Sequence, residues 1–158
     1  MRHRIVSVTG RRSVAYSTAV ALVAMITVGS APVAFADTLT VEVLGVKTAA
    51  GRMRACLWES SRGFPDCGRA RPLARAEGAP AENVRLRFEN LAPGLYAVSV
   101  LHDVDGDGRL RMNAFGLPQE PIGLSNGLRL GLTGPSFRHS QVTVSGETTV
   151  VISLQHPD

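Results

Sequence analysis

Short stretches in which apolar and polar residues alternate constrain this fold more than any other feature of the sequence. Residues 38–46 place Leu39, Val41 and Val43 at every second position, and the same period of two recurs in residues 52–58, 84–89, 95–102, 141–144 and 150–154. Successive side chains of a β-strand point to opposite faces, so each stretch predicts a strand with one buried face. We therefore predict an all-β chain of about seven short strands.

Turns that contain Gly or Pro join several of these stretches, as in residues 91–94. This pattern favours an immunoglobulin-like or transthyretin-like β-sandwich, with a small closed barrel as the alternative. Residues 59–82 carry no sustained period, and we expect a long connection there with one helical turn at residues 73–77. A second long connection, rich in Gly, spans residues 103–140.

The first 36 residues have the layout of a secretory signal peptide. Four arginines precede an uncharged apolar run that closes with Ala34, Phe35 and Ala36. Small residues at the first and third of these positions are typical of a cleavage site, so we predict cleavage before Asp37 and a single mature domain over residues 37–158. The alternative is an anchor that is retained. Cleavage predicts a periplasmic or secreted protein without a membrane span.

The charge of the remaining chain argues against a nucleic-acid partner. Four of the 17 Lys and Arg residues lie before residue 37, and the other 13 balance the 13 Asp and Glu residues. The high isoelectric point of the whole chain therefore reflects the leader. Nucleic-acid-binding domains usually carry a clustered basic stripe, which this part of the sequence lacks.

Cys56 and Cys67 are the two cysteines of the chain. An oxidising compartment allows such a pair to form a disulfide, and Cys56 falls on the outward face of its predicted strand. From that face it can reach Cys67 in the following connection. Free thiols are the alternative, while two thiols without further ligands do not complete a zinc site.

The long connection over residues 103–140 begins with three alternating aspartates. Irregular connections longer than about 12–15 residues are uncommon in compact domains unless they are functional or disordered. A D-x-D-x-D-G sequence supplies oxygens at the first, third and fifth positions of a calcium-binding loop. The Glu expected at the twelfth position is replaced by Ala114, so we expect other oxygens to complete the site. The predicted metal ligands are Asp103, Asp105, Asp107, the carbonyl of Arg109, Asn113 and Glu120.

A simpler interpretation of the same residues requires no metal. Each aspartate could accept hydrogen bonds from nearby backbone amides in Asx-turns and pair with Arg109 or Arg111. Three carboxylates within five residues repel one another unless a cation neutralises them, which favours the metal. The sequence therefore leaves both interpretations open, with calcium as the predicted ion.

Two other motifs are weaker. Residues 123–127 fit G-x-S-x-G, but the nucleophile elbow of a hydrolase requires a preceding strand and a following helix, which the surrounding Pro and Gly residues oppose. His102, His139 and His156 match no common spacing of metal ligands. We predict structural roles for the histidines.

Three ordered motifs resemble the bacterial domain of unknown function 2141 family. They are F-x-N-L-x-P-G-x-Y-A-V-x-V at residues 88–100, H-D-x-D-G-D-G-R-L at 102–110 and N-x-F-G-x-P-x-E at 113–120, and the similarity extends over residues 38–156. The resemblance implies an exported bacterial β-sandwich without an established activity. Relatives often carry Asn in place of Asp105 and Asp107 and an acidic residue in place of Arg111. Asp105 and Asp107 therefore add negative charge to the predicted site, and Arg111 places a positively charged side chain beside the aspartates.

These observations predict a non-enzymatic exported module whose long loop is stabilised by calcium. Its partner would be an extracytoplasmic protein, a glycan or a component of the cell envelope. A metal-dependent enzyme that uses the same acidic loop is the alternative. An element of a larger surface assembly is a third class, which would show an exposed apolar patch or an unpaired sheet edge.

Overall fold

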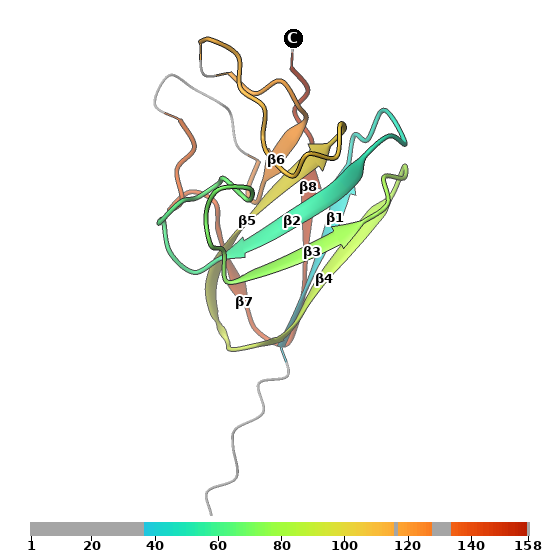
Figure 1. Cartoon of the computed structure of the whole chain (residues 1–158). Coiled ribbons are helices and arrows are strands. Elements are labelled where there is room, and N and C mark those ends of the chain that lie inside the picture. Colours follow the sequence, from blue (N-terminus) through green and yellow to red (C-terminus); the bar gives the residue numbers. More distant parts are fainter. Residues whose placement is uncertain (1–36, 116, 128–133, 158) are drawn as a thin grey trace, which may run out of the picture. The chain divides into compact units, whose positions relative to one another are not determined.

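Eight strands and no helix make up the part of the chain that the computed structural model describes, residues 37–115, 117–127 and 134–157 (Figure 1). The predicted signal peptide lies outside these residues. No helix in the described part is long and apolar enough to cross a membrane. The strands are β1 (Asp37–Leu44), β2 (Arg52–Trp58), β3 (Ala74–Gly78), β4 (Val84–Leu91), β5 (Gly94–Asp103), β6 (Ile122–Leu124), β7 (Gln141–Val144) and β8 (Glu147–Ser153).

The strands form two sheets. One has the order β4-β1-β8, in which β1 runs antiparallel to β4 and parallel to β8. The other has the order β3-β2-β5-β6, and β7 also pairs with β5. One backbone bridge joins the sheets at a corner, because the N–H of Ile122 donates to the carbonyl of Gln155 and the N–H of Gln155 donates back. The all-β prediction is confirmed.

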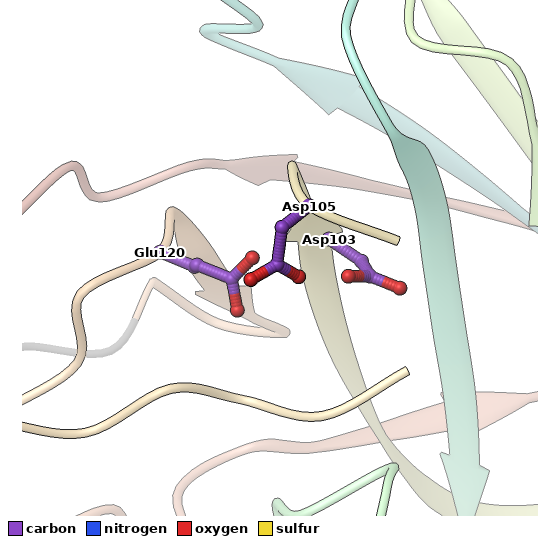
Figure 2. Close-up of side chains that lie close together, drawn as sticks. All are labelled: Asp103, Asp105 and Glu120. Carbon is purple, nitrogen blue, oxygen red and sulfur yellow. The ribbon is translucent and has the colours of Figure 1, made fainter. Parts of the chain in front are cut away.

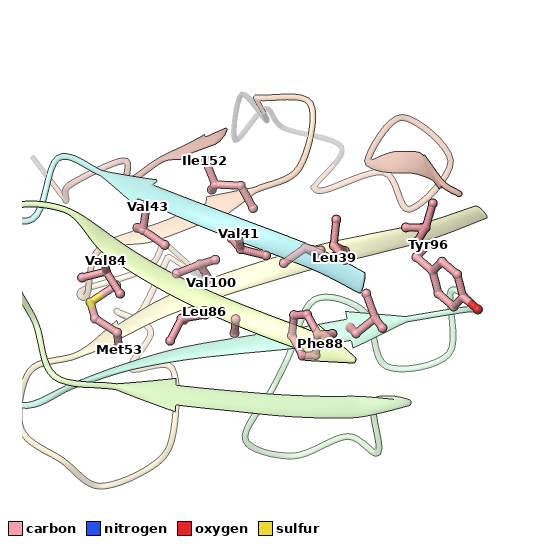
Figure 3. Close-up of a cluster of buried hydrophobic side chains, with 14 of the residues drawn as sticks. Leu39, Val41, Val43, Met53, Val84, Leu86, Phe88, Tyr96, Val100 and Ile152 are labelled. Atoms are coloured by element: carbon pink, nitrogen blue, oxygen red, sulfur yellow. The ribbon is translucent and has the colours of Figure 1, made fainter. Parts of the chain in front are cut away.

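The main core lies between the two sheets, where the inward residues of their strands meet (Figure 3). Leu39, Val41 and Val43 of β1 are fully buried, as the period of two predicts. The outward face of the same sheet is polar, with an ion pair of 2.8 Å between Arg85 Nη2 and Glu42 Oε1. One buried apolar face and one solvated polar face are common where strands pair antiparallel, as β1 and β4 do here.

The five-stranded sheet differs because both of its faces are covered. Residues 96–103 of β5 are all buried. Cys67 is bonded to Cys56 of β2 in a disulfide, as the sequence predicts. Two connections lie against the outer face of this sheet: the disulfide loop, residues 59–73, and the acidic loop, which comprises the described residues of 104–121. Beneath the disulfide loop lies a second apolar cluster, made of Cys56, Trp58, Cys67 and Ala97 with Phe64, Ala70 and Phe137 against it.

The helical turn predicted at residues 73–77 was wrong, because this segment is strand β3. It pairs antiparallel with β2 in a register that sets Ala76 opposite Ala55. Ala, Arg and Glu favour helices when the chain is isolated, but pairing with a neighbouring strand overrides this weak preference. The prediction of about seven strands also missed β6, which lies within the long Gly-rich connection.

Candidate metal centre

Asp103 ends β5 and is fully buried. Its Oδ2 accepts a hydrogen bond of 3.0 Å from the N–H of Gly108. The same oxygen lies 2.9 Å from Nε of Arg54 on β2, in an ion pair whose N–H is not aligned for a hydrogen bond. The other oxygen, Oδ1, has no hydrogen-bond partner among the described residues. A buried acceptor left unsatisfied costs about 1–3 kcal/mol, so this oxygen is available for a ligand.

Glu120 approaches Asp103 from the far end of the acidic loop and is also buried. Its Oε1 accepts a hydrogen bond of 2.9 Å from the N–H of Val104, and its Oε2 accepts one of 3.2 Å from the N–H of Arg111. One carboxylate thus fastens the beginning and the middle of the loop. This contact closes the acidic loop into a ring on the outer face of the sheet.

Asp105 is the third member of the group and is more exposed. One carboxylate oxygen from each of Asp103, Asp105 and Glu120 lies within 4.8 Å of the others (Figure 2). Oδ1 of Asp105 accepts a hydrogen bond of 3.2 Å from the N–H of Asp107, and Oδ2 pairs with the guanidinium of Arg111. Two arginines therefore offset part of the negative charge of three carboxylates.

The other predicted ligands have different surroundings. Asp107 is not in the group, and its Oδ1 accepts a hydrogen bond of 2.7 Å from the N–H of Arg109. The side-chain oxygen of Asn113 accepts from the N–H groups of Phe115 and Leu117. Positive φ angles of 76° at Gly106 and 80° at Gly108 reverse the chain, which returns the N–H of Gly108 to Asp103. The loop therefore combines a carboxylate group with the Asx-turns of the simpler interpretation.

Hard oxygens are the ligands that calcium and magnesium prefer, and calcium takes six to eight of them in a flexible geometry. Three carboxylates converge here, and the group contains no sulfur or imidazole among the described residues. Chemically, the arrangement suits a hard divalent cation, provided that further oxygens complete its shell.

A family profile described as an uncharacterised protein conserved in bacteria, DUF2141, matches residues 41–152. The chain belongs to this family. The match begins in β1 and ends in β8, so it includes both loops on the outer face, and the predicted resemblance is confirmed. Searches of curated proteins and of solved structures found no match.

The hydrolase-like motif of this DUF2141 chain has a structural role. Ser125 is buried, accepts a hydrogen bond of 2.9 Å from the N–H of Val98, and donates to the carbonyl of Ser140. These bonds tie the end of β6 to β5 and to the approach to β7. The described residues after Ser125, 126–127 and 134–157, contain no helix of the kind that a nucleophile elbow requires.

The histidines of this DUF2141 chain do not form a group in the part that the structure describes. Nε2 of His102 lies 2.9 Å from the carbonyl of Ala50, and Nε2 of His156 lies 2.6 Å from the carbonyl of Gly45. A carbonyl only accepts, so each ring nitrogen donates. The backbone carbonyl of His139 accepts from the side-chain amide of Asn126.

Arg54 is the residue of the candidate site that the sequence did not single out. Besides Asp103, it pairs with Glu77 of β3 at 3.5 Å. Arg54 alternates with the core residues Met53 and Ala55, so its outward face was predictable. Its partner was not, because the register of β2 against β5, which sets Arg54 opposite Leu101, is a property of the folded sheet.

Proposed function

We propose that this chain is an exported, non-enzymatic binding or accessory module whose acidic loop is ordered by calcium. The proposed architecture is the immunoglobulin-like or transthyretin-like kind of β-sandwich. The observation that carries the proposal is the buried carboxylate of Asp103, whose Oδ1 has no partner beside two further carboxylates. A cation at this point would satisfy that oxygen and offset the repulsion within the group.

Calcium is preferred to magnesium because of the irregular placement of the donors. Magnesium requires a near-octahedral shell of short bonds, whereas calcium tolerates variable numbers of oxygens at about 2.3–2.6 Å. Here Asp103 and Glu120 are buried and Asp105 is exposed. The three lie at the end of β5 and at separate positions along the acidic loop. Water molecules and backbone carbonyls would supply the remaining ligands.

Export is proposed from the leader-like first 36 residues and from the bond between Cys56 and Cys67. Disulfides persist in oxidising compartments such as the periplasm and the cell exterior. The partner would be a protein, a glycan or a component of the cell envelope outside the cytoplasm.

A structural role of the cation is favoured over a catalytic one by the hydrogen bonds of the carboxylates. Both oxygens of Glu120 accept backbone N–H groups, and Asp103 accepts one more. These bonds hold the loop in place. A metal-dependent enzyme that uses the same group remains the second candidate in the proposal.

Thermal melts in millimolar calcium and in chelator test the proposal. Ligand at about 100 times Kd stabilises the folded state by about 2.7 kcal/mol, and each kcal/mol raises the midpoint by about 2–8 °C for domains of this size. We expect a rise in calcium and a smaller one in magnesium. Asp105→Asn and Glu120→Gln, which keep the shape of each side chain, should abolish most of the rise.

Asp107→Asn is the matched control, because an amide oxygen can still accept from the N–H of Arg109. It should melt like the parent and keep the calcium response. Equal midpoints in calcium and chelator for the parent protein would contradict the proposed site. A response that Asp107→Asn removes would instead favour the loop geometry predicted from the sequence.

A further inference from the structure

The far end of the acidic loop carries a group of exposed apolar side chains. This apolar tip consists of the described residues of 112–117, in which Phe115 is 88% exposed, Leu117 56% and Met112 49%. The other exposed large apolar side chains of the described residues each lie on a different strand or connection, and they are Leu44, Leu73, Leu95 and Val151. Exposed apolar residues that lie singly need no explanation, whereas a group of them marks an interaction site.

Hydrogen bonds within the loop hold the apolar tip in a fixed turn. The N–H of Asn113 donates to the carbonyl of Leu117 at 2.9 Å, and the N–H of Gln119 donates to that of Arg111 at 2.8 Å. Oδ1 of Asn113 accepts from the N–H groups of Phe115 and Leu117. Because the backbone of the tip is already ordered, little further conformational entropy is lost when its side chains contact a partner.

The size and position of the apolar tip favour a lipid surface over a protein partner. In Figure 1 the orange loop that follows β5 extends beyond the ends of the strands. Stable protein interfaces involve about 20–30 residues on each side, far more than such a tip offers. A lipid interface, in contrast, accepts a few apolar side chains to a depth of about 5–10 Å without matching their shape. Residues 112–119 carry no charge that would oppose this insertion.

Two arginines lead into the apolar tip. Arg111 directly precedes Met112, and its side chain is 55% exposed. Arg109 is exposed as well and forms no ion pair among the residues that the structure describes. A guanidinium group binds phosphate through paired N–H donors, and basic residues are attracted to anionic lipid surfaces. An apolar tip with arginines at its base therefore matches a layer of acyl chains beneath a layer of anionic headgroups.

Acidic side chains of the same loop oppose this attraction until a cation is bound. Residues 103–120 carry four acids and two arginines, a formal charge of −2. Carboxylate oxygens of Asp103, Asp105 and Glu120 lie within 4.8 Å of one another, and the proposed calcium at this point would bring the formal charge of the loop to zero. Asp105 also pairs with the guanidinium of Arg111. Calcium bound by Asp105 would release this guanidinium to a headgroup phosphate.

We infer that the apolar tip binds the surface of a lipid bilayer with anionic headgroups, and that calcium permits this binding. The inference rests on the proposed function, since it names the component of the cell envelope that the proposed module binds. Phe115 and Leu117 enter the apolar layer, and Arg109 and Arg111 contact the phosphate groups. The two sheets stay outside the bilayer.

Sedimentation with sucrose-loaded vesicles tests the inference. The protein used begins at Asp37, because the apolar leader would itself bind lipid, and it contains all eight strands and both apolar clusters. The vesicles contain equal parts of phosphatidylglycerol and phosphatidylcholine. In millimolar calcium we expect half of the protein to sediment at about 1 mM lipid, since three side chains bind more weakly than one acyl chain. Chelator, or vesicles of phosphatidylcholine alone, should weaken binding by about tenfold.

Phe115→Ser should weaken vesicle binding by about tenfold or more, because a large apolar side chain no longer leaves water. Leu95→Ser is the matched control, since Leu95 is 56% exposed, as Leu117 is, but lies at the opposite end of β5 from the acidic loop. It should bind like the parent. Both variants should also melt like the parent. In Phe115→Trp, the fluorescence should shift to shorter wavelengths when vesicles are added in calcium, whereas the buried Trp58 should not respond.

The outcomes separate this inference from the proposed function. A Phe115→Ser protein that sediments like the parent, or an equal loss in Leu95→Ser, would overturn the inference. A calcium-dependent melt without sedimentation would also overturn it, while leaving the cation site intact. Sedimentation that is unchanged in chelator would support the tip and overturn its coupling to the cation. A dimer that Phe115→Ser abolishes, without sedimentation of the parent, would overturn the lipid as partner and identify a second copy of the chain.

Discussion

The disulfide loop and the acidic loop cover the same face of the same sheet, but they are fastened by different interactions. The disulfide loop is tied to β2 by the bond between Cys56 and Cys67, and its Phe64 packs edge-on against Trp58 with ring centres 5.8 Å apart. The acidic loop lacks such a bond and is held by Asp103, Glu120 and the amides that they accept from. A covalent bond and apolar contacts act whatever the ion concentration, whereas a group of carboxylates responds to it.

The two loops also contact each other on this face of the sheet. The two meet at Gly68, where an added Cβ would lie 2.6 Å from the carbonyl oxygen of Gly108 and 3.1 Å from Cα of Arg109. The disulfide loop thus contacts the acidic loop directly. If the proposed cation binds, stability and response to the ion would be separated along the chain, and the following changes are designed to test that separation.

Removal of the disulfide should have the largest effect. Replacing Cys56 and Cys67 together with Ala should lower the free energy of unfolding by about 2–4 kcal/mol, because the unfolded chain regains the freedom of a closed loop. Urea denaturation measures this loss. The midpoint should still rise in calcium, since no carboxylate has changed, and a vanished calcium response would show that the two loops act as one unit.

Gly68→Ala should come next, at about 1–3 kcal/mol, because the added methyl group forces the backbone of the two loops apart. Unlike the disulfide variant, it should also reduce the calcium response. Gly94→Ala is the control, since the nearest contact of an added Cβ there is an ordinary 3.5 Å to Tyr96. A Gly68→Ala protein as stable as this control would mean that the loops do not press on one another.

Ser99→Ala should cost about 1–2 kcal/mol. Ser99 Oγ accepts a hydrogen bond of 2.9 Å from Nε1 of the buried Trp58, and the variant leaves this N–H without a partner. The loss should appear equally in calcium and in chelator, because it concerns the apolar cluster beneath the disulfide loop. Ser145→Ala, an exposed turn position, serves as the comparison.

Arg111→Ala should have the smallest effect on stability in chelator, about 0.5 kcal/mol or less, because its pair with Asp105 is largely exposed. In calcium the effect should reverse. Without the guanidinium, Asp105 is free to bind the ion, so the midpoint should rise further than in the parent. An unchanged or smaller rise would show that Arg111 does not compete with the cation.

The alternation of residues predicted the strands that contribute to the core, since Leu39, Val41 and Val43 must be buried whatever their partners. Strand β3 escaped prediction because the residues that alternate toward the core, Ala74 and Ala76, are small and favour helices when isolated, so the strand is specified by β2 beside it. Strand β6 escaped because Gly123 suggested a loop. In the structure, a Cβ there would lie 2.5 Å from Cγ2 of Ile152, so close packing of the sheets requires this glycine.

The carboxylate group was predictable in part from the order of residues along the chain. The spacing of Asp103 and Asp105 on a loop after a strand indicated an acidic group, and Glu120 was the nearest further acid. The sequence could not show that Asp107 turns to the N–H of Arg109, because that depends on the reversals at Gly106 and Gly108. The sequence also could not reveal Arg54, which contacts Asp103 from the neighbouring strand β2.

Strand β1 lies between β4 and β8, so the first strand of the domain takes the last strand as a neighbour. The register sets Thr38 beside Glu147 and Leu44 beside Ser153. Until residues 147–153 have been synthesised, one edge of β1 has no strand to pair with. Completion of this sheet must therefore wait until residues 147–153 are available to pair, and a version that stops before Glu147 would expose an open β-edge to its neighbours.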